Sequence, residues 1–345
     1  MDKKEYFEYH KAWEECLQVA EGCYYTATCK DPAIGAHVVS EAWLRTLASQ
    51  GKVYWFSRNK GIPKDVIEGF ERGEGIRKLL QRLKKSQPSL VSIGLATRSK
   101  FCCKQHDREF NLIDSRENMN LQAPDVHHLN LMFYRALIRQ LHVDTAKKAL
   151  GLRQPDVKAG WSLRPQFDED SADNLQQPRQ VLLQALGAKK GGAWCVRHEV
   201  RHIPGRPRVA AACAASWRPG EGVVAMDDLK CTGAWGCTVI PHDGGHLVAY
   251  HYCTTLPKGP RAKKDLEWKK NHLLTEVIKE DVELPFSVSR DLLELCEEIC
   301  LVPSVWNTYS SSTQKAIQDV FSDDIGGWLG GNLRVHPQKR INLFT

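Results

Sequence analysis

Two pairs of residues in the first third of the chain have the types and spacing of zinc ligands. Cys23 and Cys29 are separated by five residues, and Cys103 is followed three positions later by His106. Structural zinc sites use thiolate and imidazole ligands in a closed tetrahedron. The first pair can converge across a tight loop, and the second fits a knuckle that opens a helix. The sequence therefore predicts a structural Zn²⁺ site.

The cysteines leave two alternatives open. Cys102 competes with Cys103 for the third ligand position, although its spacing to His106 suits a helical turn less well. The two pairs could also be unrelated, with the thiols acting as small core residues. Most other cysteines lie in apolar runs and are predicted to be core residues: Cys16, Cys195, Cys213, Cys231, Cys237, Cys253, Cys296 and Cys300.

The order of the motifs resembles a widespread set of uncharacterised bacterial proteins. Those proteins share a cysteine pair, an Ala-His dipeptide and a Phe-Cys-x-x-His-Asp motif. Here the dipeptide is Ala36-His37, and the last motif ends at Asp107, with Ile113-Asp114 following it. The likeness covers residues 20–140 and extends loosely to residues 238–252 and the C-terminal helices. It implies a bacterial or phage setting, such as defence against mobile DNA.

A more distant resemblance is to the treble-clef His-Asn-His, or ββα-metal, nucleases. It implies that His37 is a general base that activates water. It also implies that Asp107 is a ligand of a catalytic Mg²⁺ or Mn²⁺. The chain departs from that pattern, because Asp replaces the final His, no clear Asn intervenes, and a helix is inserted before Cys103. The alternatives are a histidine bonded to a backbone carbonyl and an acid at a helix N-terminus.

Composition places the chain among ordinary globular proteins. Its 345 residues are 42% hydrophobic and 26% charged, and the formal net charge of +7 permits nucleic-acid binding without requiring it. No apolar run of membrane-spanning length occurs, and the charged start lacks the apolar stretch of a secretion signal. We therefore expect a cytoplasmic protein with no membrane partner.

The periodicity of apolar residues predicts an α+β protein. We expect a zinc-stabilised treble-clef domain over 1–148, a linker or boundary over 149–192, and a mostly antiparallel sheet with flanking C-terminal helices over 193–345. Expected helices cover 4–20, a segment after Ser40, 63–85, 127–142, 178–186, 262–280, 289–300 and 310–322. Expected strands cover 34–39, 53–56, 194–203, 209–217 and 222–226, with a hairpin over 238–252 and a poorly anchored tail from 326.

Histidines and arginines of the second half offer further candidates. His242, His246 and His251 lie near cysteines on the predicted hairpin, but alternation along a strand places His246 and His251 on opposite faces. A shared metal site is therefore disfavoured. A basic face with neighbouring tryptophans could bind nucleic acid or be ordinary solvated surface: Arg197, Arg201, Arg206 and Arg208, with Trp194 and Trp217.

Together these features predict a zinc-containing protein that binds nucleic acid, DNA rather than RNA, and that could be a metal-dependent nuclease. The alternative is a non-catalytic interaction or regulatory protein. In that case the zinc would be structural and the sheet would bind a protein partner.

Overall fold

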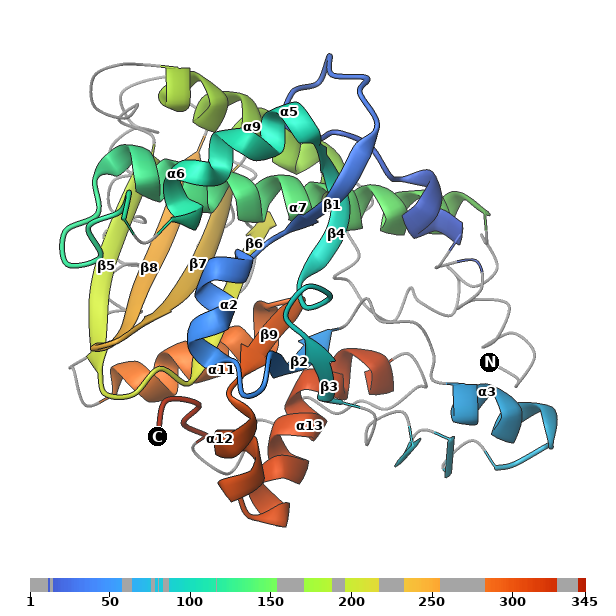
Figure 1. The fold of residues 1–345 in the computed structure, drawn as a ribbon. Helices are drawn as coiled ribbons and strands as arrows, with labels where there is room; N and C mark the ends of the chain where they lie inside the picture. Colours follow the sequence, from blue (N-terminus) through green and yellow to red (C-terminus); the bar gives the residue numbers. More distant parts are fainter. Residues whose placement is uncertain are drawn as a thin grey trace, which may run out of the picture.

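A computed structural model describes residues 12, 15–57, 64–75, 78–79, 81–82, 87–115, 117–153, 171–187, 196–216, 233–254, 283–327 and 341–345. Helices pack on both faces of a long antiparallel sheet, and a small two-stranded sheet lies in front of it (Figure 1). The predicted elements over 222–226 and 262–280, and the beginning of the helix predicted over 4–20, fall outside the described residues.

The small sheet is formed by two strands that are distant in sequence. Strand β1 (Ala33–His37) pairs antiparallel with β4 (Arg98–Cys103), so that Ala33 faces Cys103 and His37 faces Arg98. Between the two strands the chain forms α2 (Glu41–Leu47), β2 (Lys52–Ser57), α3 (Lys64–Glu71) and β3 (Ser89–Ser92). Ser40 caps α2 as predicted, because its Oγ accepts a hydrogen bond from Trp43 N at 3.5 Å.

Short helical segments follow the small sheet. After β4 the chain turns through α5 (Lys104–Asp107), the 3-10 segment η1 (Arg108–Phe110) and α6 (Asn111–Asp114). Phe110 and Ile113 are buried and attach these segments to the core. The side chains that precede and follow α5 are therefore held against the rest of the molecule.

The large sheet has seven strands in the order β3-β2-β9-β6-β7-β8-β5, and every neighbouring pair is antiparallel. Its other strands are β5 (Val196–Pro204), β6 (Val209–Ser216), β7 (Gly233–His242), β8 (Gly245–Thr254) and β9 (Glu298–Leu301). The prediction of a mostly antiparallel sheet is thus confirmed. Strands β2 and β9 pair directly, so the expected parts 1–148 and 193–345 share this sheet; their separation into folding units stays a prediction.

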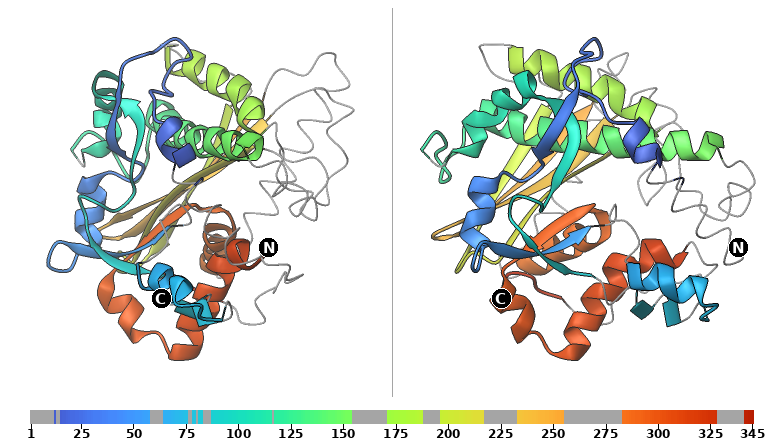
Figure 2. Two further views of the ribbon diagram at one scale, coloured as in Figure 1. Left: turned by 90° about the vertical axis from the view of Figure 1, so that its right-hand side faces the viewer. Right: turned by 45° about the vertical axis from the view of Figure 1, so that its right-hand side comes forward.

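Helices cover the two faces of the large sheet. Helices α7 (Val126–Arg153) and α9 (Ser171–Gly187) lie on one face, while α11 (Leu284–Leu295), α12 (Pro303–Thr308) and α13 (Ser311–Gly327) lie toward the other (Figures 1 and 2). Two separate apolar clusters result, one under α7, α9 and α2, and one under the C-terminal helices. The small sheet belongs to the first cluster.

Three segments differ from the expectations. Helix α9 lies within the expected linker and packs on α7, since Leu175 and Leu182 are fully buried. Residues 298–301 form β9 instead of the end of a helix, because pairing with β2 and β6 overrides local helical periodicity. The last residues are anchored, since Leu343 is fully buried among the C-terminal helices.

Candidate metal centre

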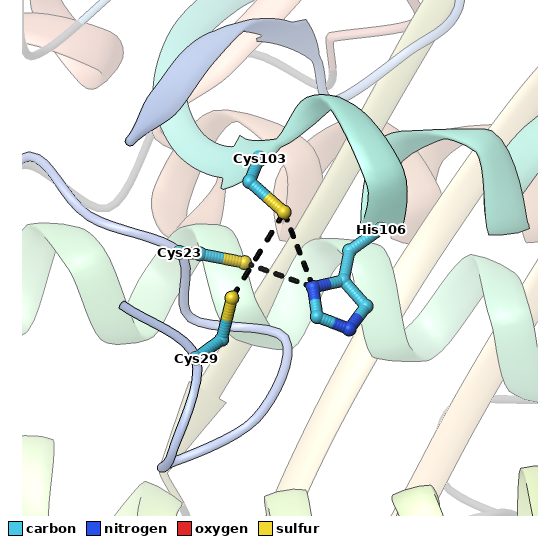
Figure 3. A group of neighbouring side chains, drawn as sticks. All are labelled: Cys23, Cys29, Cys103 and His106. Carbon is cyan, nitrogen blue, oxygen red and sulfur yellow. Dashed lines mark hydrogen bonds between the residues drawn. The ribbon is translucent and has the colours of Figure 1, made fainter. Parts of the chain in front are cut away.

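The fold brings the four predicted zinc ligands together. Cys23 and Cys29 lie on the loop before β1, Cys103 ends β4 and His106 lies in α5 (Figure 3). One ligand atom from each residue lies within 4.8 Å of the others. His106 Nδ1 is 3.3 Å from the Sγ atoms of both Cys23 and Cys103, and the Sγ atoms of Cys29 and Cys103 are 3.9 Å apart.

These separations fit the edges of a zinc tetrahedron. Zn–S bonds of about 2.3 Å and Zn–N bonds of about 2.0 Å place the ligand atoms about 3.5–3.8 Å apart. A disulfide would require an S–S distance of about 2.05 Å, and all four cysteines of this region are free thiols. The Cys3His cluster could therefore hold a metal ion, and its donor set favours zinc among the common metals.

Cys102 lies beside the cluster without entering it. The ligand set includes Cys103, and Cys102 is fully buried behind it. A hydrogen bond from Cys102 lowers the pKa of Cys23, although burial opposes the shift. The shift favours the thiolate of Cys23, which is the form that binds a metal.

Aromatic side chains and α7 fix the loop that carries the first pair. The Tyr25 ring stacks on the His106 ring with centroids 4.4 Å apart and an interplanar angle of 9°. The buried Tyr134 hydroxyl of α7 donates to the Tyr25 carbonyl, and Arg179 of α9 donates to the Tyr24 carbonyl at 3.3 Å. The ligands are therefore positioned by residues from two helices as well as by their own loops.

His37 lies at the end of β1 with its ring orientation fixed. Its Nδ1 is 2.8 Å from the Ala96 carbonyl oxygen, which can only accept, so Nδ1 carries the proton and Nε2 has the free lone pair. Thr97 holds that carbonyl in place from a left-handed conformation, with φ of 57°, and its Oγ1 donates to Val39 O at 3.1 Å. Burial lowers the pKa of His37, which favours the neutral imidazole.

Asp107 is half-buried next to a group of charges. Burial raises its pKa, Arg135 and His37 oppose the shift, and Asp114 adds to it. Arg135 of α7 is 3% exposed and forms a bidentate ion pair with Asp114, at 2.6 and 2.8 Å. Its guanidinium also lies 4.4 Å from the centre of the Phe110 ring. His37 and Asp107 therefore share one electrostatic environment.

Arg135 and Arg98, which faces His37, were not among the residues predicted from sequence to belong to the site. Arg135 could have been noticed as a charged residue inside the apolar stripe of the helix predicted over 127–142, where a buried charge requires a partner. Nothing in the local pattern singles out Arg98, because its position across Gly35 depends on the pairing of two strands, and these two residues are 63 positions apart in the sequence.

The histidines of the β7–β8 hairpin do not converge. His251 lies on the α7 side, stacked on Phe133, with its ring nitrogens 2.9 Å from His198 Nδ1 and 3.1 Å from Thr238 Oγ1. His246 lies on the opposite side, where its Nε2 accepts from Arg208 N at 2.8 Å. Within the described residues, the Cys3His cluster is the one group of three or more potential ligands close enough to hold a metal.

The buried His251 predicts loss of stability in acid. Burial holds the pKa of His251 well below its ordinary value, so the unfolded chain binds the proton first as the pH falls below about 6.5. The stability present above that pH is lost as the pH falls toward 4. We expect His251→Gln, which keeps hydrogen-bonding groups, to reduce the pH slope of the unfolding free energy by about 1.4 kcal/mol per pH unit.

Urea unfolding from pH 7 to 4 measures this slope. The exposed His127→Gln is the control, and an equal slope in all three proteins would contradict the expectation.

No helix in the described part of the chain is long and apolar enough to cross a membrane. No family model, curated protein or solved structure matches the chain.

Proposed function

We propose that this chain is a zinc-containing nucleic-acid-binding protein with an HNH-like, metal-dependent nuclease site. The observation that carries the proposal is the setting of His37, whose Nε2 lone pair is freed by the bond from Nδ1 to the Ala96 carbonyl. Within the described residues, no side chain or backbone group bonds to Nε2. A fixed, neutral imidazole is the arrangement that a general base requires.

The order of the elements around the cluster supports a treble-clef interpretation. A ligand-bearing loop precedes β1, the strands β1 and β4 pair, and the second ligand pair opens a helix. In this proposal Cys23, Cys29, Cys103 and His106 bind a structural Zn²⁺, which ties the loop to the helix. The residues between β1 and β4 are then an insertion within the motif.

The proposed reaction is hydrolysis of a phosphodiester. His37 Nε2 accepts a proton from water, and the water oxygen forms a bond to phosphorus as the bond to the leaving sugar oxygen breaks. The leaving oxygen takes up a proton from solvent, and His37 releases its proton to solvent, so that one water is consumed for each bond cleaved. Asp107 would hold a Mg²⁺ or Mn²⁺ ion, which supplies charge stabilisation at the phosphate and the leaving oxygen. The carboxylate of Asp107 suits such a hard cation, and its place directly after His106 links it to the zinc-held helix.

The proposed partner is DNA, in a cytoplasmic setting of defence against mobile DNA. The net charge of +7 is compatible with that partner, and free thiols in the cluster suit a reducing compartment. The competing role is a non-catalytic one, in which His37 only orients its strand through the Ala96 carbonyl. Affinity for duplex and single-stranded DNA across a salt series separates the two, because phosphate contacts make binding fall steeply with salt.

His37→Ala is expected to reduce cleavage by about 100-fold or more, because general-base catalysis contributes about 10²–10⁴. The assay uses plasmid, single-stranded DNA and RNA in Mg²⁺ or Mn²⁺. His127→Ala, at an exposed position on α7, is the matched control and should cut like the wild type. Equal cutting by the His37 variant, or no cutting by the wild type, would refute the nuclease role.

A further inference from the structure

Arg98 is placed beside His37 by strand pairing. It is the cross-strand partner of His37 in the β1–β4 sheet, and its side chain is exposed. Arg98 Nε donates a hydrogen bond to the Gly35 carbonyl at 3.2 Å, so the guanidinium lies across β1. Burial is the larger cause of the lowered pKa of His37, and the charge of Arg98 also lowers it.

Gly35 makes room for this arrangement. The pairing of β1 and β4 is irregular between Ile34 and Ala36, and bulges of this kind often redirect side chains near active sites. A Cβ at residue 35 would overlap Nε of Arg98 and would lie 2.7 Å from its Cζ and 2.8 Å from one Nη. Gly35 does not have a left-handed conformation, so its backbone does not require a glycine. The absence of a side chain at this position instead leaves room for Arg98.

Arg98 also lacks an acidic partner, unlike its neighbours. Lys100, two residues along the same strand, pairs with Glu21 at 2.8 Å. Arg135 is occupied by Asp114. Within the described parts of the chain no carboxylate pairs with Arg98, and its two terminal amino groups have no hydrogen-bond partner. A guanidinium fixed at Nε with both amino groups available is suited to a bidentate contact with phosphate.

We propose that Arg98 is a substrate-binding residue whose guanidinium binds the two nonbridging oxygens of the DNA phosphodiester beside His37. Because Gly35 has no side chain, the Arg98 side chain can lie across β1 in the position that this contact requires. This inference rests on the proposed function and adds the group that positions the phosphate. Contact with Arg98 places phosphorus next to the water that His37 activates. It also stabilises the negative charge that builds up on the phosphate oxygens in the transition state.

Cleavage by four variants tests this role. Arg98→Ala should lower kcat/KM by about 100-fold, the usual effect of losing one charge-stabilising donor. Arg98→Lys should recover only part of this loss, because a lysine lacks the planar fork. Gly35→Ala leaves the net charge unchanged but displaces Arg98, and should lower kcat/KM by about 10-fold. The control Lys100→Ala removes the same charge from the same strand and should stay within about three-fold of the wild type. Wild-type activity in Arg98→Ala, or equal losses in Arg98→Ala and Lys100→Ala, would overturn the proposal while leaving the nuclease role intact.

A binding measurement decides the question without cleavage. The His37 ring resonances are followed by NMR, in EDTA-free buffer without added Mg²⁺ or Mn²⁺, during titration with the dinucleotide dTpdT and separately with inorganic phosphate. We expect a saturable shift with dTpdT in the wild type and in Lys100→Ala, and no shift in Arg98→Ala. A response to inorganic phosphate alone would mean a free-anion site and would overturn the assignment to a phosphodiester. A shift that survives in Arg98→Ala, or no shift in the wild type, would overturn it as well. Absence of cleavage with a dTpdT shift that depends on Arg98 would reject catalysis but support the binding site.

Discussion

Cys103→Ala is expected to abolish binding of the proposed zinc ion and to unfold the region around the cluster. Cys103 connects the two ligand pairs, because its Sγ lies near both Cys29 Sγ and His106 Nδ1. Without it, a metal ion would no longer join the loop over 23–29 to the start of α5. Structural zinc provides about 10–16 kcal/mol of apparent binding free energy in small zinc-finger peptides.

The loss should be smaller here than in a zinc finger. The large sheet has its own apolar core, and aromatic contacts also hold the ligand loop. We therefore expect a destabilisation of about 3–5 kcal/mol, which corresponds to a fall of about 4–7 °C in Tm for a chain of this size. Hydrogen exchange should show faster exchange over 23–37 and 98–114 than over β6, β7 and β8.

Cys102→Ala is the matched control for this substitution. Cys102 is adjacent and equally buried, but it lies outside the ligand set. Its variant should keep the metal and lose only the smaller stability of a truncated core side chain. Metal content and thermal unfolding of both variants measure the contrast. Loss of metal from Cys102→Ala, with metal retained in Cys103→Ala, would contradict the ligand assignment.

Arg139→Ala is expected to destabilise the protein by about 3–5 kcal/mol, because it leaves a buried carboxylate without its counter-charge. Arg139 of α7 and Glu298 of β9 are 6% and 5% exposed, and Arg139 Nη2 donates to Glu298 Oε1 at 3.1 Å. Burial already raises the pKa of Glu298, and the charge of Arg139 opposes that shift. Urea unfolding at pH 7 measures the loss.

Two comparisons show whether the buried charge is the cause. Glu298 Oε2 and two nitrogens of Arg139 are buried and have no hydrogen-bond partner, so the ion pair does not make all the hydrogen bonds that its buried atoms require. The double variant Arg139→Leu/Glu298→Leu should therefore recover most of the lost stability. Nearby, Lys147 and Glu297 form a more exposed pair at 3.0 Å, and Lys147→Ala should cost no more than about 1 kcal/mol. A small effect of Arg139→Ala, or a double variant as unstable as the single one, would contradict this account.

Local patterns were sufficient to predict the features that depend on neighbouring residues. The spacing of the two ligand pairs singled out four side chains that do meet in the fold. Ser40 before an apolar stripe predicted the start of α2, and the glycines after His242 predicted the β7–β8 hairpin, where Gly245 has φ of 136°. Each of these signals arises within a few residues of chain.

Features that depend on distant parts of the chain could not be predicted in this way. The pairing of β2 with β9 joins residues 52–57 to residues 298–301, and no local pattern encodes that partner. The same holds for Arg98, whose position across Gly35 requires β1 and β4 to pair with a bulge. The helix predicted over 178–186 was found, but its polar composition concealed that α9 begins at Ser171 and that its buried leucines pack against α7.

The most direct test of the central claim is X-ray absorption at the zinc K-edge of the purified protein, combined with its metal content. The account predicts about one zinc per chain, with three sulfur neighbours at about 2.3 Å and one nitrogen neighbour at about 2.0 Å. Absence of zinc, or a coordination shell made of oxygen and nitrogen without sulfur, would contradict it.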